Sequence, residues 1–587
     1  MGIEPKLGSD IIKMTSVKES FDKTENIGVI GSPSSTSELT VDILGTAVNK
    51  GLVGKFSVFN YFQDGADHYA LGQITEILMQ NVWTQDATMR GIIRQKGRVD
   101  PITEKQDIHT AKMIVSSVFA EQDNSIEPSM FGTVPATGTP IRLFDKEIID
   151  ALLANFKEEL FYLGKTYGTD INLPMWLKNF GSEKYGAGEA YHIGIFGKTG
   201  SGKSVLAKMM ITGYLRHNSM SIYILDPQGE FSTEFSSNPK LKAIMKNELK
   251  RDVNIITLQN ITFDYSEILL RKLLNSTNFF ERLSIWYNDH KVRFVNEFIS
   301  ILKSRSTLDG PFTPWNYYKR EAFNKIWNQI PTEQFLRKTI GTRNPRDRVK
   351  STWNNLNADE MYDIWKGITS LFKYRQNSIR LSELFKTISG KGVFVIIDLS
   401  SREKPEDIIW NDQIQLIAIE QILSKINDQA EESFKEGGNL NSLVVIDEAH
   451  RLAPREKSDD QDIELIKSIF IDAVRTTRKF GLGWMFISQT LSSLHREILN
   501  QIRIFVFGFG LAWGLERQAL WEILGGATEA LKLYQNFRDP QSSLGKREYP
   551  FMATGPISPL SFSGTPLFFT AFLYPDEFLR INFIRSD

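Results

Sequence analysis

Residues 197–204 read Gly197-Lys198-Thr199-Gly200-Ser201-Gly202-Lys203-Ser204, which fits the pattern G-x-x-x-x-G-K-[ST]. The apolar run Tyr191 to Phe196 precedes this loop, and the helical run Val205 to Leu215 follows it. A glycine loop between a strand and a helix is the setting in which this pattern holds nucleotide phosphates, because successive backbone N–H groups can turn toward them. We expect Lys203 to reach the β- and γ-phosphates of ATP and Ser204 to bind Mg²⁺.

Apolar runs alternate with helical segments on both sides of this loop, which predicts a parallel α/β sheet. Buried strands are expected at residues 191–196, 221–225, 253–257, 393–398, 443–447, 484–488 and 504–508. Between the third and fourth strands, residues 262–390 are rich in Trp, Asn and Lys and have a helical texture. We interpret them as a helical subdomain inserted into the nucleotide-binding core.

The segment from Ile27 to about Ile93 has a different texture, with short β-branched runs separated by Gly, Pro, Ser and Asn. This spacing predicts a small barrel, and an irregular α+β module is the alternative. Asp145 to Tyr162 has the pattern of an amphipathic linker helix. The expected division is a flexible N-terminus (1–25), a barrel and linker (26–145), the first part of the core (146–261), the insertion (262–390) and the second part with a C-terminal segment (391–587).

Two carboxylates, Asp447 and Glu448, lie at the end of the expected strand at 443–447. Ligands of open α/β sheets bind where the parallel strands end, so Asp447 is placed to hold Mg²⁺ and Glu448 to orient or deprotonate the attacking water. The alternative is that the two acids cap the next helix. Asp447-Glu448-Ala449-His450 also spells the box of a helicase superfamily that needs a second motor domain. We interpret that match as coincidence and His450 as a local hydrogen-bonding residue.

Three further sites follow from their positions in the pattern. Gln489 directly follows the strand at 484–488 and is placed to touch the γ-phosphate or the attacking water; a turn residue at the strand end is the alternative. Asp226 and Glu230 follow the second strand and are expected to shape the water and magnesium network, with a structural turn as the alternative. Arg475 and Arg478 lie near the end of a helix, where a cation favours the helix dipole, or where either could enter a neighbouring subunit's site as an arginine finger.

Composition excludes several kinds of site. The chain has 587 residues, 69 Lys and Arg against 70 Asp and Glu, no cysteine and seven histidines. Disulfides, thiolate nucleophiles and cysteine-containing metal sites are therefore absent, and any polyanion site must be a local patch. No apolar run reaches the length of a membrane span, so we expect a cytoplasmic protein. One local patch is Arg337, Lys338, Arg343, Arg346, Arg348 and Lys350, which could follow a phosphate backbone or be ordinary solvated charge.

Taken together, these motifs resemble those of the HerA family, a branch of the HerA/FtsK class of P-loop motors. The residues that carry the resemblance are His192 to Ser204, Asp226 to Glu230, Asp447-Glu448, and Arg478-Lys479-Phe480-Gly481-Leu482-Gly483 running into Ser488-Gln489. The segment from Ile27 to about Thr84 also looks like the family's HAS barrel, with Gly72 to Ile77 close to its usual ending. Thr476-Thr477 stand where relatives often have a glycine, which leaves the trans arginine open between Arg475, Arg478 and Arg503.

The resemblance implies a RecA-like P-loop NTPase core with a helical insertion, preceded by a small N-terminal β-barrel. It also implies a homo-hexameric ring with ATP and Mg²⁺ at the subunit interfaces and double-stranded DNA in the central pore. A nuclease or other effector partner, in DNA end processing or anti-phage defence, is expected by the same analogy. The alternatives are an ATP-regulated ring scaffold that activates an effector, and a coupling ATPase of a secretion or conjugation apparatus.

Overall fold

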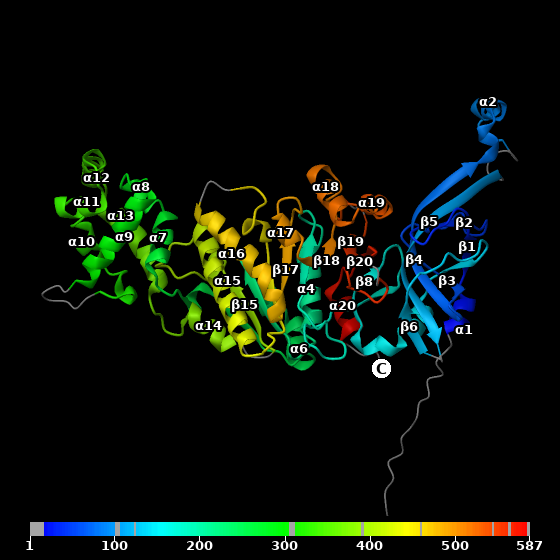
Figure 1. Ribbon diagram of the computed structural model, residues 1–587, viewed down its shortest axis with the longest axis horizontal. Coiled ribbons are helices and arrows are strands. Elements are labelled where there is room, and N and C mark those ends of the chain that lie inside the picture. Colours follow the sequence, from blue (N-terminus) through cyan, green and yellow to red (C-terminus); the bar gives the residue numbers. More distant parts are fainter. Residues whose placement is uncertain are drawn as a thin grey trace, which may run out of the picture.

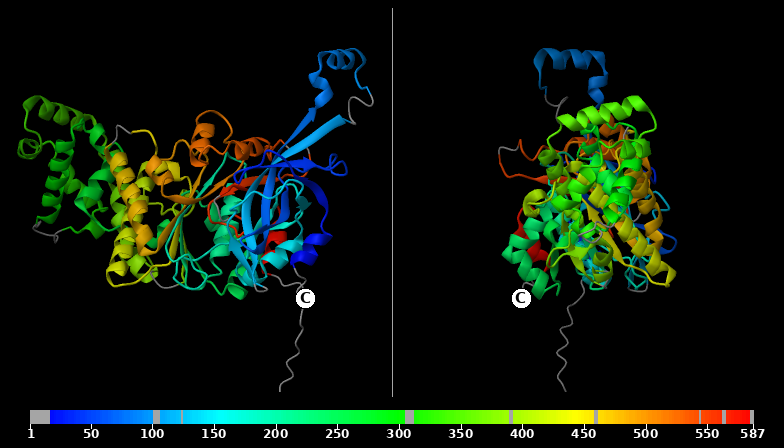
Figure 2. Two further views of the ribbon diagram at one scale, coloured as in Figure 1. Left: turned by 45° about the vertical axis from the view of Figure 1, so that its right-hand side comes forward. Right: turned by 90° about the vertical axis from the view of Figure 1, so that its left-hand side faces the viewer.

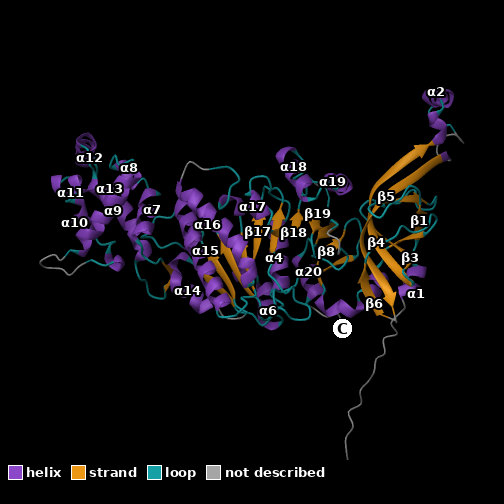
Figure 3. Ribbon diagram, viewed as in Figure 1, coloured by secondary structure: helices purple, strands orange, loops and turns teal. Residues whose placement is uncertain are grey.

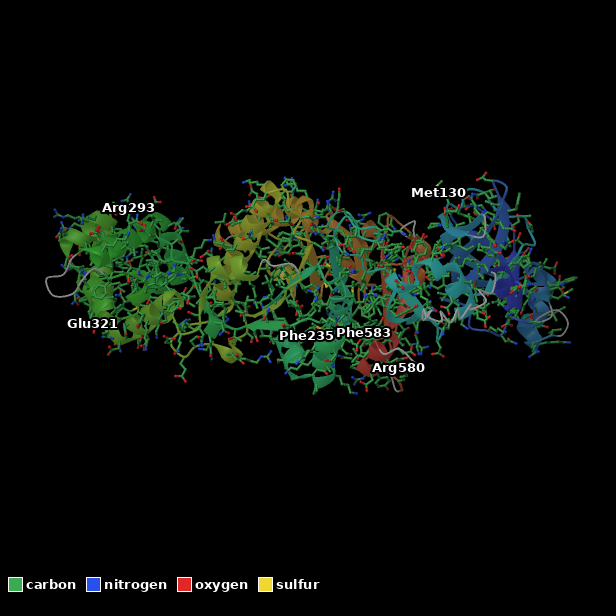
Figure 4. All side chains as sticks on the ribbon, turned by 90° about the horizontal axis from the view of Figure 1, so that it is seen from below. Met130, Phe235, Arg293, Glu321, Arg580 and Phe583 are labelled. Atoms are coloured by element: carbon green, nitrogen blue, oxygen red, sulfur yellow. The ribbon has the colours of Figure 1, made fainter. Side chains whose placement is uncertain are left out.

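The computed structural model describes residues 17–99, 106–122, 125–304, 312–388, 392–457, 461–542, 545–561 and 565–583. Three parts lie in a row along the long axis of the molecule: a helical lobe at one end, an α/β core, and a β-barrel at the other end (Figure 1). Seen from below, Met130 of the barrel lies at the opposite end of the molecule from Arg293 and Glu321 of the lobe (Figure 4).

The core is one sheet in which eleven strands are described, in the order β12-β15-β11-β16-β17-β10-β18-β19-β20-β8-β9. The first seven run parallel and match the seven expected strands: β12 (Val253–Ile256), β15 (Phe394–Asp398), β11 (Ser221–Asp226), β16 (Ser442–Ile446), β17 (Leu482–Ser488), β10 (His192–Phe196) and β18 (Ile502–Phe507). The last four are antiparallel: β19 (Tyr549–Thr554), β20 (Leu567–Ala571), β8 (Phe161–Thr166) and β9 (Asn172–Met175).

Helices cover both faces of the parallel strands, which is why those strands are continuous apolar runs. The flanking helices are α4 (Lys203–Tyr214), α5 (Glu230–Ser237), α6 (Pro239–Asn247), α15 (Asp412–Lys435), α16 (Gln461–Thr477) and α17 (Arg496–Leu499). On one face, Ile193 and Ile195 of β10 belong to the same buried cluster as Leu206 of α4. On the other face, Phe486 of β17 packs against Phe470 of α16. The sequence prediction of a mixed α/β core is confirmed.

The N-terminal part is a closed barrel of six strands in the order β1-β7-β3-β4-β5-β2, with β6 paired to the outside of β5. The strands are β1 (Asn26–Ile30), β2 (Leu39–Ile43), β3 (Phe56–Gln63), β4 (Ala66–Asn81), β5 (Asp107–Gln122), β6 (Ser125–Ser129) and β7 (Pro140–Leu143). The predicted barrel is confirmed. β4 and β5 run beyond it as an arm, and the arm's tip consists of a 3-10 turn at Val82–Gln85 and α2 (Ala87–Lys96) (Figure 2).

Two segments differ from the sequence expectation. Residues 1–25 are expected to be flexible, but Val17–Lys23 forms α1, with Phe21 buried against the ring of Tyr69; residues 1–16 lie outside the described part. The linker helix expected up to Tyr162 ends earlier, because α3 (Lys146–Leu152) and a 3-10 turn lead into β8. In both cases the partner that decides the structure lies far away in sequence, and local periodicity does not reveal it.

The helical lobe lies in the chain between β12 and β15, and almost all of it is helical (Figure 3). Its helices are α7 (Glu267–Asn275), α8 (Phe279–Arg282), α9 (Asn288–Lys303), α10 (Arg320–Trp327), α11 (Glu333–Thr339), α12 (Arg343–Asn355), α13 (Ala358–Thr369) and α14 (Leu381–Ile388), with the short pair β13 (Ile261–Thr262) and β14 (Ile379–Arg380). A buried ion pair, Lys272 Nζ to Glu420 at 3.0 Å, joins α7 to α15 of the core.

Two polar contacts, of which the first is buried, join the barrel to the core. The side chain of Gln73 in β4 accepts the N–H of Phe568 at 3.2 Å and donates to its carbonyl at 3.4 Å, which places the barrel directly against β20. Lys532 of α19 (Thr528–Gln535) pairs with Glu76 at 2.9 Å. The remaining helices of this region are α18 (Gly514–Ile523) and α20 (Pro575–Asn582). Among the described residues, none of the helices has the length and apolar run that crossing a bilayer would require.

Candidate nucleotide-binding and catalytic site

The glycine loop lies between β10 and α4 and is fastened on both sides. The N–H of Gly197 donates to Ser488 O at 3.3 Å, and the N–H of Lys198 donates to Phe509 O at 2.9 Å. Gly200 and Gly202 have φ values of 82° and 88°, which side chains of other residues rarely allow. In the described part of the chain, no group accepts the N–H of Gly200 or Gly202. Free N–H groups at the start of α4 fit the binding of an anionic phosphate.

Lys203 lies at the first turn of α4 with its side chain largely buried. Its ammonium donates to Lys198 O at 3.2 Å, so the lysine folds back over the loop. Burial lowers the pKa of Lys203, while the charges of Glu448, Asp447 and Glu230 act in the opposite direction. The lysine and three of the predicted acids therefore lie close enough to interact.

Asp447 and Glu448 follow directly on β16. Burial raises the pKa of Asp447 to about 7, and the charge of Glu448 adds to the effect. Glu448 has a left-handed backbone with φ of 52°, and its Oε2 atom is buried without a hydrogen-bond partner among the described residues. His450 Nδ1 lies 3.3 Å from this oxygen and 3.2 Å from Ser488 Oγ. Oε2 of Glu448 therefore faces the His450 ring and receives no hydrogen bond in the part of the chain that the structure describes.

Gln489 joins the glycine loop to the acidic strand end. Its Nε2 donates to Glu448 Oε1 at 2.7 Å, and its Oε1 accepts from Thr199 Oγ1 at 3.0 Å. This link is possible because β17 lies between β16 and β10 in the sheet. The strand ends thus place Thr199, Gln489 and Glu448 in one hydrogen-bonded chain.

Asp226 and Glu230 take different positions. Asp226 is fully buried, and its two carboxylate oxygens accept the N–H groups of Glu230 at 3.0 Å and Ser232 at 2.8 Å. It therefore fixes the turn that starts α5, which is the structural alternative considered from the sequence. Glu230 pairs with Lys208 of α4 at 3.2 Å, and its charge acts on both Lys203 and Asp447. Of the two acids, Glu230 is the one whose charge is felt by Lys203 at the start of α4.

Several residues of this region were not identified from the sequence. Asp398 ends β15 and accepts from Ser232 Oγ at 2.6 Å; it also ends an expected buried strand, so the rule applied to Asp447 would have found it. Arg402 donates to Gln228 O at 3.0 Å and also to Gly229 O, which clamps the Asp226 turn. The side chain of Gln541 packs on Gly200, so closely that an added Cβ would lie 2.2 Å from its Nε2. No local signal connects residues that far apart.

The two candidate arginines lie away from the glycine loop of their own chain. Arg475 ends α16 and Arg478 follows it, so both precede β17 and lie at the amino ends of the parallel strands. We name this side the arginine edge, and the opposite side, with the carboxyl ends and the loop, the nucleotide edge. Arg478 lies 3.8 Å from Glu189 and Arg475 lies 3.6 Å from Glu497. Both guanidinium groups are more than half exposed, and Arg503 on β18 is exposed as well.

Residues 190–426 match the family model of the central domain of helicase HerA. The resemblance expected from the motifs is confirmed over this segment, which contains the glycine loop, the Asp226 turn, the helical lobe and Asp398. The match ends within α15, before Asp447. Residues 190–426 accordingly form a HerA-like P-loop ATPase domain.

Solved structures that match the chain include VirB4 of Thermoanaerobacter pseudethanolicus, at 16% identity and a TM-score of 0.37, covering 71% of this chain and 97% of that one. The bacterial conjugative coupling protein TrwBΔN70 matches at 12% identity and a TM-score of 0.36, covering 65% and 84%. The genome packaging NTPase B204 of Sulfolobus turreted icosahedral virus 2, in complex with AMPPCP, matches at 11% identity and a TM-score of 0.27, covering 65% and 98%. No curated protein matched the chain.

Proposed function

We propose that this HerA-type ATPase hydrolyses ATP and uses the energy to move along double-stranded DNA as a hexameric ring. The observation that carries the proposal is the hydrogen-bonded chain from Thr199 through Gln489 to Glu448. It joins the loop that would hold the phosphates to the carboxylate that would receive the proton of the attacking water. A P-loop that only bound nucleotide would not need this connection.

In the proposed reaction, the free N–H groups of the loop and the ammonium of Lys203 hold the β- and γ-phosphates. Glu448 Oε2 accepts a proton from the water that attacks the γ-phosphorus in line. Gln489 holds the other oxygen of Glu448 and so fixes the direction in which Oε2 faces. Because Gln489 also touches Thr199, its position would change when the γ-phosphate leaves.

The residues present fit a bound Mg²⁺. Its usual sites combine one or two protein ligands with phosphate oxygens and water, and Ser204 and Asp447 would supply that pair. The raised pKa of Asp447 is the sign of a buried carboxylate that a cation would stabilise as the anion. When bound, Mg²⁺ would neutralise charge on the β- and γ-phosphates.

Two arginines at the nucleotide edge are held by other groups: Arg402 donates to the Asp226 turn, and Arg451 pairs with Asp412 at 2.9 Å. Arg475 and Arg478 are exposed on the arginine edge and would act in a neighbouring subunit, an effect worth roughly 10³ to 10⁵ in rate. This supports assembly as a condition for hydrolysis.

A partner protein is the remaining part of the proposal. The tip of the barrel arm exposes Val82 and Trp83, at 62% and 47%, far from the nucleotide edge. An exposed apolar tip of this kind supports docking of a nuclease or another effector, in DNA end processing or anti-phage defence.

The proposal is tested by measuring ATP turnover of the purified protein with and without duplex DNA, together with its mass in solution. We expect that duplex DNA stimulates ATP turnover and that the mass in solution is that of a ring.

Lys203→Ala should abolish ATP turnover. Glu448→Gln should lower kcat by about 10² to 10⁴ while ATP still binds. Glu406→Gln, an exposed carboxylate elsewhere, is the control. Full turnover in Lys203→Ala would refute the catalytic assignment, whereas biological activity that survives Glu448→Gln would favour an ATP-regulated scaffold.

A further inference from the structure

The proposed reaction gives His450 no role, although this residue lies beside the carboxylate that would accept the proton. His450 is part of the 3-10 turn Ala449–Arg451, which begins directly after Glu448. Glu448 itself has φ of 52°, a left-handed backbone that strains a residue with a side chain. At this bend the side chains of Glu448 and His450 meet, with Nδ1 3.3 Å from Oε2. Backbone strain of this kind is often kept where the arrangement that it produces is used.

The hydrogen bonds of Ser488 decide which ring nitrogen of His450 carries the proton. Ser488 ends β17 and is fully buried, and its hydroxyl donates to Thr490 O at 2.9 Å. A hydroxyl has one hydrogen, so toward His450 this oxygen can only accept. The contact of 3.2 Å between Nδ1 and Ser488 Oγ is therefore a hydrogen bond that Nδ1 donates.

The ring of His450 is neutral at pH 7. Burial lowers its pKa, and the charge of Arg451 acts in the same direction, while the charge of Glu448 acts in the opposite one. Arg451 itself pairs with Asp412 of α15 at 2.9 Å. A neutral ring with its proton on Nδ1 presents a polar N–H to the side on which Ser488 and Glu448 lie.

This cluster does not have the arrangement of a nucleophilic triad. In a triad of serine, histidine and an acid, the serine and the acid contact different nitrogens of the ring. Here Ser488 Oγ and Glu448 Oε2 both lie beside Nδ1, and the serine is fully buried. The arrangement is suited to orient a carboxylate rather than to activate a hydroxyl.

Two adjacent residues at the end of β17 therefore act on the two oxygens of Glu448. Gln489 donates directly to Oε1 at 2.7 Å. Ser488 holds the ring of His450, whose N–H points at Ser488 and whose polar edge lies 3.3 Å from Oε2. This second contact is electrostatic, and Oε2 keeps its lone pairs for a water molecule. The backbone carbonyl of Ser488 also accepts the N–H of Gly197, so the same strand end is fastened to the glycine loop.

We propose that His450 is a positioning residue: held by Ser488, it keeps Oε2 of Glu448 in the direction from which that oxygen accepts the proton of the attacking water. The inference rests on the proposed ATP hydrolysis and deepens it, because His450 acts through Glu448. It gives the last residue of Asp447-Glu448-Ala449-His450 a function that needs no second motor domain. Since His450 touches neither the phosphates nor the glycine loop in this proposal, its loss should affect kcat and leave KM unchanged.

The first test replaces His450 in the full chain by Leu, Asn and Gln. Asparagine places its amide nitrogen close to the position of Nδ1, whereas glutamine places it near Nε2. His450→Leu should lower kcat about 10- to 100-fold, because a small misorientation of a catalytic group has effects of this size. The KM for ATP and the affinity for a fluorescent ATP analogue should stay as in wild type. His450→Asn should recover most of kcat, and His450→Gln should not.

The second test asks whether His450 acts through Glu448. His450→Leu is combined with Glu448→Gln, and the slow hydrolysis that remains is measured in single turnovers. Residues that act as a unit are not additive, so adding His450→Leu to Glu448→Gln should change the rate less than twofold. A further loss of about 10- to 100-fold in the double variant would show that His450 acts elsewhere, and the inference would be wrong.

The control is His109→Leu on β5 in the arm, which should behave as wild type. A structural role of His450 would lower the thermal midpoint and raise KM together with the loss of kcat, without recovery in His450→Asn, and that pattern would overturn the inference. Full kcat in His450→Leu would refute the inference alone and leave the proposed function standing. A wild type that binds the analogue but hydrolyses no ATP would refute the proposed function and the inference with it.

Discussion

Among single residues, His192 is one whose acid–base behaviour folding changes. Its ring is fully buried in β10, where Nδ1 accepts the N–H of Trp484 at 3.1 Å and Nε2 donates to Val474 O at 2.9 Å. This arrangement uses both nitrogens of the neutral ring. Burial lowers the pKa of His192 from 6.5 to about 4.

Stability should therefore fall on acidification. Between pH 6.5 and 4 the unfolded chain binds a proton at this residue that the folded chain does not, so the contribution of neutral His192, about 3 kcal/mol in total, is present above pH 6.5 and is lost toward pH 4. Urea unfolding of wild type and His192→Gln at pH 7.5 and 5 measures the effect. An equal loss of stability in both proteins would show that His192 is not responsible.

At this scale the sequence predicted the residues that end strands and missed those that depend on tertiary contacts. Gln489 and Glu448 could be placed because each ends a buried apolar run, and strand ends of a parallel sheet meet at one edge. Arg402 gave no such signal: only the folded chain brings it to the carbonyl groups of Gln228 and Gly229. Asp226 looked the same as Asp447 in sequence, and only its two backbone hydrogen bonds reveal that it fixes a turn.

At the scale of elements, one buried side chain of the barrel bonds directly to the backbone of the core. Gln73 pairs with both backbone groups of Phe568, so β4 of the barrel and β20 of the core are held in register. Gln73→Ala would leave the Phe568 N–H unsatisfied and should destabilise the protein by about 1 to 3 kcal/mol. Denaturant unfolding measures this, with Gln80→Ala, exposed on the same strand, as the control. Equal stabilities of the two variants would contradict a role for Gln73 in the join.

The seven parallel strands could be predicted within two residues because burial on both faces makes each a continuous apolar run. The antiparallel strands β8, β9, β19 and β20 could not. The linker helix expected from the sequence runs into the start of Phe161–Thr166. This segment is a strand because β20, some 400 residues later, supplies its hydrogen-bond partner. Pairing over that distance leaves no local periodicity.

At the scale of the whole molecule, the question is where a DNA backbone would contact it. The basic segment of the lobe is partly neutralised: Arg337 and Arg346 lie 2.8 and 3.0 Å from Glu333, and Lys338 lies 2.6 Å from Glu297. Arg343, Arg348 and Lys350 on α12 are exposed, and within the described ranges only Arg343 has an ion-pair partner, Asp347 at 3.7 Å. These three are the residues best placed to meet phosphates.

Replacing Arg343, Arg348 and Lys350 by Gln should weaken duplex DNA binding. It should also reduce the slope of log affinity against log salt concentration by about 0.9 for each phosphate that these side chains neutralise in the wild type. Binding measured between about 50 and 200 mM salt gives both quantities. The control replaces Arg337 and Lys338, whose charges are already paired, and should change the slope less. Equal slopes in both variants would show that the charges on α12 are ordinary solvated charges and do not contact DNA.

The strand order of the core has a consequence for how the protein is made. β10 ends at Phe196, but its two neighbours in the sheet are β17 and β18, and β18 ends at Phe507. At roughly 5–20 residues per second, a ribosome needs about 15 to 60 s to add the residues in between. During that time the nascent β10 is an apolar strand with two open edges, so this chain is a natural client for chaperones that shield such segments until synthesis has passed residue 507.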